Sequence, residues 1–177
     1  MSLTALRYSD LYNLRLGKIE KASTIDNQDF YFVTLASQKA DKTIAIPILA
    51  PVYSIFEKYK NAFPQPLTNQ TFDLRIKEIC QKAKFNAIIK INKNRGTADT
   101  TEEYKKYEIV SAHTCRRSFI SNMILLGVPE IVLKQISHPM RGKGVFESYN
   151  KISLATNISL FFTYLYKNKN VSWLLDY

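Results

Sequence analysis

The chain has 177 residues, 46% of them hydrophobic and 23% charged, which is enough for one globular domain with a buried core. Lysine and arginine outnumber the acidic residues by 25 to 15, and the formal charge of +10 favours a polyanionic partner, nucleic acid or an anionic membrane surface. Two cysteines, no run of about 18 apolar residues and no apolar leader lead us to expect a cytoplasmic protein, not a disulfide-rich secreted or membrane-spanning one.

The first 60 residues predict a short helix, a hairpin of two strands and a second helix. Residues 8–20 place leucines on one side of a helix, with Ser9 as its N-terminal cap. Residues 30–37 are β-branched and aromatic, which is typical of a strand, and after a polar turn residues 43–48 return as the hairpin partner. Residues 49–60 predict the second helix, with a proline tolerated in its first turn.

The middle of the chain predicts a helix followed by a hairpin with a long loop. Apolar residues recur at helical spacing over 68–85, and Thr68 or Asn69 is the expected cap. Two short apolar segments, 87–91 and 107–110, predict strands. The polar segment between them predicts the hairpin loop.

The last third predicts helices over 114–126, 129–137, 145–153 and 157–169, the first of which ends at Gly127. Together the elements predict a mainly α-helical domain with a small antiparallel β-sheet, an α+β fold. We expect the whole chain to form a single domain, because no repeat or low-complexity segment divides it.

The segment "SAHTCRRSF" combines a histidine and two arginines at the start of a predicted helix. His113 and Arg116 are three residues apart, so both side chains can lie on one helix face. Arginine binds phosphate oxygens through two parallel hydrogen bonds, and a helix N-terminus adds amide donors. The alternative is a first turn that is basic by chance. Because the helix dipole disfavours each cation there by about 0.3–1 kcal/mol, Arg116 and Arg117 suggest a use as a phosphate pocket.

An ordered set of short segments resembles the catalytic domain of the tyrosine recombinases, the phage-integrase family, and in particular its mobile-element integrases. The matching segments run from residue 4 to about residue 151. They are "TALRYSDLYNL" with Arg7, "SQKADKTIAIPI" with Lys39, "HTCRRSF" with His113 and Arg116, "QISHP" with His138, and "FESYNK" with Tyr149.

The resemblance implies DNA strand breakage and rejoining without a metal ion or another cofactor. Tyr149 would attack a phosphodiester, form a 3′-phosphotyrosyl link and release a 5′-hydroxyl. A tyrosine hydroxyl has a pKa of about 10, so it needs a strongly positive setting to attack readily. Arg7 and Arg116 would supply that setting by binding the non-bridging oxygens.

The remaining matched residues would move protons or bind the phosphate. Lys39, in preference to Lys42 of the same turn, would protonate the departing 5′ oxygen. His113 would assist proton transfer to or from the nucleophile, and His138 would hydrogen-bond the phosphate. Arg117 is expected to support the site, and Cys115 is expected to have a packing role.

The chain departs from the family pattern at three places. Ala5 replaces the usual glycine of the first motif, and Ser137 stands where glycine usually precedes the second histidine. The gap from His138 to Tyr149 is 11 residues, where nine is usual. Because of these departures, a DNA-binding module that has lost catalysis remains an alternative interpretation of the chain.

The resemblance also implies partners. We expect double-stranded DNA as the substrate, no membrane, and a homotetramer on two DNA sites in the full-length protein, acting at the nucleoid of the bacterial cytoplasm. Family members carry a separate core-binding domain before the first arginine, so we interpret the chain as a catalytic-domain fragment.

Apolar residues in 171–177, such as Trp173 and Leu174, suggest docking on a neighbouring protomer. Relaxation of supercoils in the manner of a type IB topoisomerase and a basic protein–protein module remain alternatives.

Overall fold

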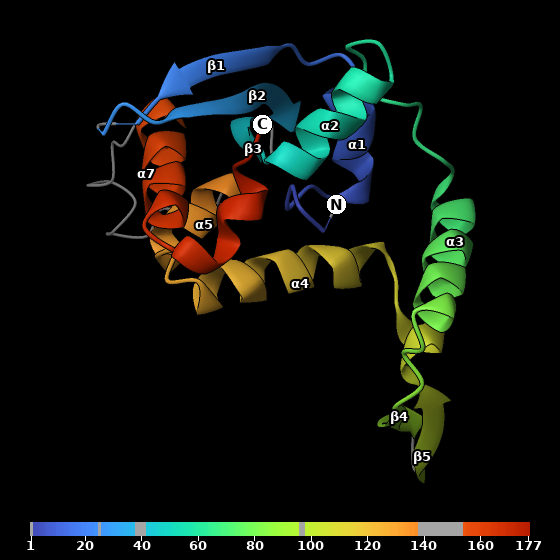
Figure 1. The fold of residues 1–177 in the computed structure, drawn as a ribbon. Helices are drawn as coiled ribbons and strands as arrows, with labels where there is room; N and C mark the ends of the chain where they lie inside the picture. Colours follow the sequence, from blue (N-terminus) through green and yellow to red (C-terminus); the bar gives the residue numbers. More distant parts are fainter. Residues whose placement is uncertain (1, 25, 38–41, 96–97, 138–153) are drawn as a thin grey trace. The chain divides into compact units, whose positions relative to one another are not determined.

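The computed structural model describes residues 2–24, 26–37, 42–95, 98–137 and 154–177 (Figure 1). The chain forms two compact units: unit 1 combines Met1–Pro66 with Arg116–Tyr177, and unit 2 consists of Leu67–Cys115. Unit 2 is therefore an insertion in the sequence of unit 1. Helices and two small antiparallel sheets confirm the predicted α+β class. In the described ranges, no helix has the length and apolar character needed to cross a membrane.

The elements of unit 1 surround one sheet. They are η1 (Tyr8–Asp10), α1 (Leu11–Leu14), β1 (Ile19–Ser23), β2 (Asp29–Ser37), β3 (Lys42–Ile48), α2 (Ala50–Lys58), α5 (Glu130–Ser137), α7 (Leu154–Tyr166) and η3 (Lys169–Leu174). Helix α4 (Ala112–Leu125) begins in unit 2 and continues in unit 1 from Arg116. The elements of unit 2 are α3 (Asn69–Lys82), β4 (Ile88–Arg95), β5 (Ala98–Lys105) and η2 (Lys106–Ile109).

The sheet of unit 1 has the strand order β1-β2-β3, and both strand pairs are antiparallel. Val33 pairs with Ile19 on one side and with Ile46 on the other, so β2 is the central strand. Pro47 lies in β3, at the edge of the sheet, where a missing N–H does not interrupt a ladder between strands. The predicted hairpin of 30–37 and 43–48 is confirmed.

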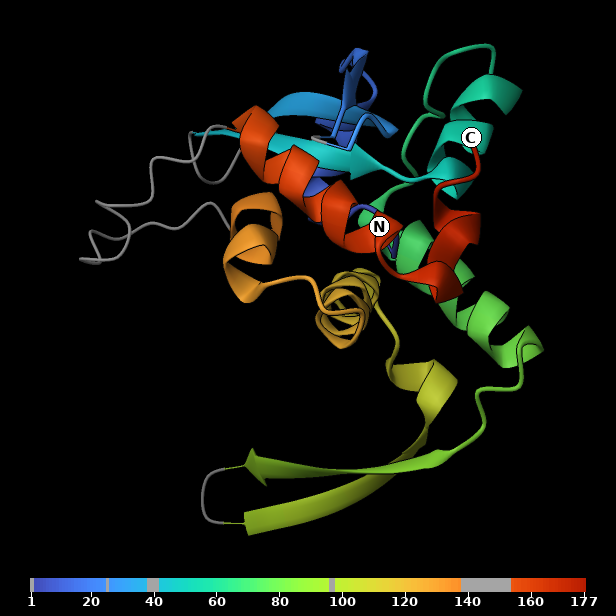
Figure 2. The same cartoon turned by 60° about the vertical axis from the view of Figure 1, so that its left-hand side comes forward.

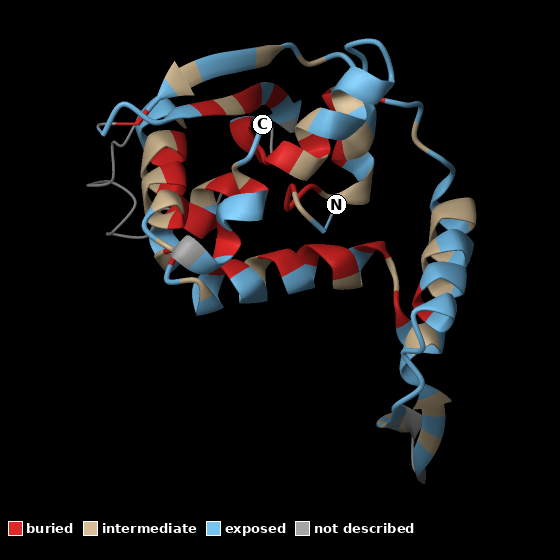
Figure 3. Cartoon of the chain, viewed as in Figure 1, coloured by how far each residue is buried: buried red, intermediate tan, exposed pale blue. Residues whose placement is uncertain are grey.

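The core of unit 1 lies between this sheet and the helices α5 and α7, which contact each other and β3 (Figures 1 and 2). Phe162 on α7 stacks on Phe30 on β2 with ring centroids 4.7 Å apart, and Phe161 stacks on Phe119 of α4 at 6.3 Å. All four rings are at most 1% exposed. Figure 3 shows the buried residues of these elements on the sides that face one another. Aromatic stacking and apolar burial thus fix α4 against the sheet-and-helix core.

Helix α4 ends as its sequence predicts. Gly127 adopts a φ of +84°, and its N–H donates to the carbonyl of Ile124 at 2.9 Å. The N–H of Val128 donates to the carbonyl of Met123 at 3.0 Å. This pair of bonds is the Schellman motif, for which glycine is favoured because a Cβ disfavours positive φ.

Unit 2 contains helix α3, the β4–β5 hairpin, the 3-10 segment η2 and the first turn of α4. The side chain of Thr68 accepts a hydrogen bond from the amide of Thr71 at 3.3 Å, so Thr68 rather than Asn69 caps α3. Strands β4 and β5 pair in register from Ile88 opposite Lys105 to Arg95 opposite Ala98.

Three predictions of local structure are wrong: the first helix, the polar hairpin loop and the strand over 107–110. The helix expected over 8–20 ends at Leu14, and β1 begins at Ile19. Ser9 lies inside η1 and does not cap it. A Cβ at Gly17, which follows the end of this helix, would come within 2.2 Å of a side-chain carbon of Val33, so the turn into β1 requires glycine there.

The polar segment expected as a loop forms most of β4 and β5, and 107–110 is largely the 3-10 segment η2 instead of a strand. Cross-strand polar pairs such as Lys90 with Glu103, 3.1 Å apart, stabilise strands that lack an apolar pattern. The helix expected over 145–153 lies outside the described residues.

The apolar C-terminal segment packs on its own unit. Leu174 is 2% exposed in the core of unit 1, whereas Trp173 is 56% exposed. Leu174 is thus a core residue of this unit, and docking of the segment on a neighbouring protomer stays a prediction.

Candidate anion-binding site

The centre of the candidate site is Arg116, which α4 carries into the interior of unit 1. Only 4% of its surface is exposed, and arginine is almost never buried to this extent unless it is paired. Its guanidinium Nη1 donates a hydrogen bond to the backbone carbonyl oxygen of Ala5. This bond joins residues 111 positions apart, so it brings the first sequence motif to the helix that carries the H-x-x-R pair.

Arg7 approaches the same place from the N-terminal segment. Its backbone is extended, with φ −71° and ψ 153°, and immediately precedes η1. The carbonyl of Arg7 accepts a hydrogen bond from the amide of Asp10 at 3.0 Å, which closes the first turn. The Arg7 side chain is half-buried, and its charge lies close enough to influence Arg116.

The electrostatic setting of Arg116 is unfavourable for a cation. Burial lowers the pKa of Arg116 from its ordinary value to about 10, with a further lowering contribution from the positive charge of Arg7 and an opposing one from Asp10. The guanidinium of Arg116 is still charged at neutral pH. Folding therefore places the positive charges of Arg7 and Arg116 near each other where they are partly shielded from water. A bound anion would relieve both the repulsion and the loss of hydration.

Two buried oxygen atoms lie on the same N-terminal segment as Arg7. Thr4 is 3% exposed and Asp10 is 2% exposed. Among the described residues, neither Thr4 Oγ1 nor Asp10 Oδ1 has a hydrogen-bond partner. Buried polar atoms in folded proteins usually have partners, and those without one commonly mark a functional site or a water position. We define Thr4, Arg7, Asp10 and Arg116 as the arginine cluster.

The first turn of α4 offers fewer free amides than the sequence suggests. The N–H of Ala112 donates to Asp73 Oδ1 at 2.9 Å. The amides of Thr114 and Cys115 both donate to the carbonyl of Ser111, at 3.0 and 3.3 Å. The amides of Ala112, Thr114 and Cys115 are therefore already bonded within the chain, and use of the remaining first-turn amide for phosphate stays a prediction. The arginine side chains are the candidate anion-binding groups.

The H-x-x-R pair lies on α4 as predicted, but the two residues differ in setting. His113 is exposed and belongs to unit 2, whereas Arg116 is buried and belongs to unit 1. Arg117 is exposed. Cys115 is 8% exposed and burial raises the pKa of its thiol, which disfavours the reactive thiolate and agrees with the expected packing role.

Three predicted site residues, Lys39, His138 and Tyr149, lie outside the described residues. The strands on either side of the Lys39 turn are described, and they form the predicted hairpin. Of the six predicted residues, the structure therefore brings Arg7 and Arg116 together and places His113 on the same helix as Arg116.

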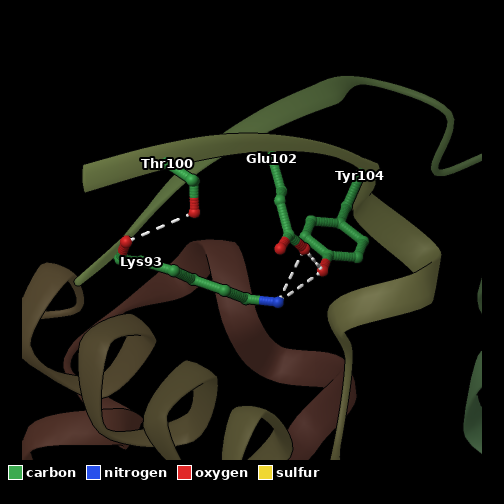
Figure 4. A network of polar contacts seen from close by, with 4 residues as sticks. All are labelled: Lys93, Thr100, Glu102 and Tyr104. Carbon is green, nitrogen blue, oxygen red and sulfur yellow. Dashed lines mark hydrogen bonds and ion pairs between the residues drawn. The ribbon is translucent and has the colours of Figure 1, made fainter. Parts of the chain in front are cut away.

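Sequence reasoning missed a polar network on the hairpin of unit 2 (Figure 4). Lys93 Nζ lies 2.6 Å from Glu102 Oε2 and 2.7 Å from the hydroxyl of Tyr104, which donates to the same carboxylate oxygen. Hydrogen bonds with Glu102 and Tyr104 raise the pKa of Lys93, and the bond with Lys93 lowers the pKa of Glu102. The network holds two strands together, and its cation is already neutralised by a carboxylate.

Unit 1 also contains an open pocket of about 650 Å³ near the end of α7. Its walls include Asp29, Asp176, Tyr166 and Tyr177, and none of its lining residues belongs to the arginine cluster. Two carboxylates and no lysine or arginine among its lining residues make this pocket unsuitable for phosphate.

Asp10 and Thr4 are members of the arginine cluster that the sequence did not single out. A sequence pattern could have identified Asp10, because an acidic residue three positions after an arginine at a helix start is a common polar partner. No such pattern identifies Thr4, since its burial follows from tertiary packing alone.

In the part of the chain that the structure describes, no group of three histidine, cysteine or acidic side chains is placed to hold a metal ion. No protein-family model, curated protein or solved structure matches the chain at a significant level.

Proposed function

We propose that this chain is the catalytic domain of a tyrosine-type site-specific DNA recombinase with a recombinase-like α+β fold. The observation that carries the proposal is the arginine cluster. A buried Arg116 and a half-buried Arg7 come from distant parts of the sequence and lie close together. The order of motifs along the chain then supplies the remaining roles.

The chemistry that fits this cluster is phosphoryl transfer. Two guanidinium groups match the two non-bridging oxygens of a phosphodiester, and they are most effective where water is excluded. Because the groups are held in place before the anion arrives, little reorganisation is needed in the transition state. The formal charge of +10 favours a long polyanion such as double-stranded DNA over a small phosphate ester.

In the proposed step the Tyr149 oxygen forms a bond to phosphorus as the bond from phosphorus to the 5′ oxygen breaks. The tyrosine proton passes to His113 or to water, and Lys39 donates a proton to the departing oxygen. Attack by a 5′-hydroxyl on the phosphotyrosyl link reverses the step and joins a new strand. The reaction exchanges one ester for another, so it requires no oxidant and no nucleotide. Four copies would act on two DNA sites.

The test uses a pool of duplex oligonucleotides of random sequence, each nicked so that cleavage releases a short strand and traps the covalent product. Denaturing gels should show protein joined to DNA for the wild type and for Tyr12→Phe, whose exposed tyrosine is the matched control. Tyr149→Phe should abolish the product.

A covalent product that survives Tyr149→Phe removes Tyr149 as the nucleophile. DNA binding that depends on Arg7 and Arg116 without any covalent product identifies a catalytically impaired binding module. Supercoil relaxation by the monomer, with no exchange of partners, identifies topoisomerase-type chemistry instead.

A further inference from the structure

Ala5 adopts an unusual backbone conformation at an unusual place. Its φ is +52°, which a residue with a Cβ rarely adopts, and the residue is completely buried. Four other non-glycine residues with positive φ are described, and all of them are exposed: Asn27, Lys60, Asn61 and Lys84. Ala5 is therefore the buried exception, and such outliers persist only where the surrounding structure holds them.

The conformation of Ala5 determines the direction of the peptide groups on both sides of it. Its carbonyl oxygen accepts the hydrogen bond from Arg116 Nη1. The next residue, Leu6, is 1% exposed and belongs to the core cluster, which fixes the chain immediately after the turn. Arg7 follows and carries the second guanidinium of the arginine cluster. One strained residue thus binds one arginine directly and lies two positions from the other.

We propose that Ala5 is a positioning residue for the arginine cluster: its left-handed backbone aims its carbonyl at Arg116 and sets Arg7 beside it, so that both guanidinium groups meet one phosphate. This inference rests on the proposed anion-binding function of the cluster. If Ala5 relaxed to negative φ, the peptide groups would turn, Arg116 would lose its buried acceptor, and the spacing of the two arginines would change. Phosphate would then bind only one of the two guanidinium groups at a time.

A purely structural role makes a different prediction. If the fold alone requires Ala5, substitutions there should lower stability without a specific effect on Arg116. A positioning role requires that the orientation of Arg116 and the affinity for anions change together, and that glycine, which adopts positive φ without strain, preserves both.

The experiment compares Ala5→Gly with Ala5→Val in the full chain, because valine is strongly disfavoured at positive φ. Ala45→Val is the matched control, since Ala45 is 2% exposed on β3, where added methyl groups test overpacking alone. The probe is inorganic phosphate, titrated by NMR. A second readout is the rotation of the Arg116 guanidinium about its Cζ–Nε bond, which a hydrogen bond to a buried carbonyl slows.

Ala5→Gly and Ala45→Val should keep the dissociation constant for phosphate within about twofold of wild type and keep the slow rotation of Arg116. Ala5→Val should weaken phosphate binding by about tenfold or more, since a hydrogen bond to a charged donor has at least this effect, and should speed the rotation. If Ala5→Val does not fold, Ala5→Gly alone decides: a tenfold loss of affinity in a folded Ala5→Gly protein overturns the inference.

Arg7→Gln and Arg116→Gln separate this inference from the proposed function. If both variants bind phosphate like the wild type, the cluster is no anion site and the proposed function fails. If both lose binding while a folded Ala5→Val protein retains it, the cluster stands and the positioning role of Ala5 is wrong.

Discussion

Replacement of Arg116 by methionine tests whether the arginine cluster is held for function at the expense of stability. The pKa of Arg116 falls well below its ordinary value, to about 10, in the folded protein, chiefly because the side chain is buried. At 1.36 kcal/mol per pH unit, folding disfavours the charged side chain by about 3 kcal/mol. Because the folded pKa is the lower one, this cost is fully present at neutral pH and lessens only above pH 10.

Methionine removes that cost and fills most of the same volume with a flexible apolar chain. It also leaves the buried Ala5 carbonyl without its guanidinium donor, which costs about 1–3 kcal/mol. Considered by themselves, these two effects place Arg116→Met between equal stability and about 2 kcal/mol more stable than the wild type. Its affinity for phosphate should nevertheless be lost, since only Arg7 remains.

Urea denaturation in chloride buffer, repeated with added phosphate, measures both effects. A ligand that binds only the folded state raises its stability, so phosphate should stabilise the wild type but not Arg116→Met. Arg117→Met is the matched control: its exposed side chain should change stability by less than about 0.5 kcal/mol and leave the response to phosphate intact. A loss of more than about 2 kcal/mol in Arg116→Met would refute the reasoning, because the charge would then be a net source of stability.

Two further substitutions test the fold. Gly17→Ala places a Cβ 2.2 Å from Val33 Cγ1, so urea denaturation should show a loss of about 1–3 kcal/mol; unchanged stability would mean that the turn moves freely. Glu102→Gln should loosen the hairpin of unit 2 at neutral pH, seen as faster amide exchange in β4 and β5. Since Lys93 lowers the pKa of Glu102, the wild type should lose this protection as the pH falls below 4.5, and the variant should not. Equal pH dependence in both proteins would exclude the ion pair as the cause.

Sequence patterns predicted the elements whose causes are local. The β2–β3 hairpin follows from two apolar, β-branched strands around a polar turn, and the end of α4 follows from Gly127. The cap of α3 follows from Thr68. Each depends on residues within a few positions of one another, so the sequence alone contains the information.

The wrong predictions have tertiary causes. The turn after the first helix requires glycine at position 17 because Val33 lies against it, and that contact crosses from one element to another. Strands β4 and β5 are polar on the outside and depend on cross-strand pairs such as Lys90 with Glu103, which helical or alternating periodicity does not reveal.

The arginine cluster was predictable in part. Arg7 and Arg116 were named from motif order, but nothing local indicates that Ala5 accepts the hydrogen bond from Arg116. A backbone acceptor has no sequence signature, and a positive φ at alanine runs against the preference of the residue.

The two residues of the H-x-x-R pair have different tasks under the proposed function. Arg116 is fixed by its own burial and by its hydrogen bond to the Ala5 carbonyl, whereas His113 on the same helix is exposed. Anion binding then depends on Arg116 and proton transfer on His113. A change at His113 should therefore slow the chemical step while phosphate still binds, and a change at Ala5 or Arg116 should remove binding itself.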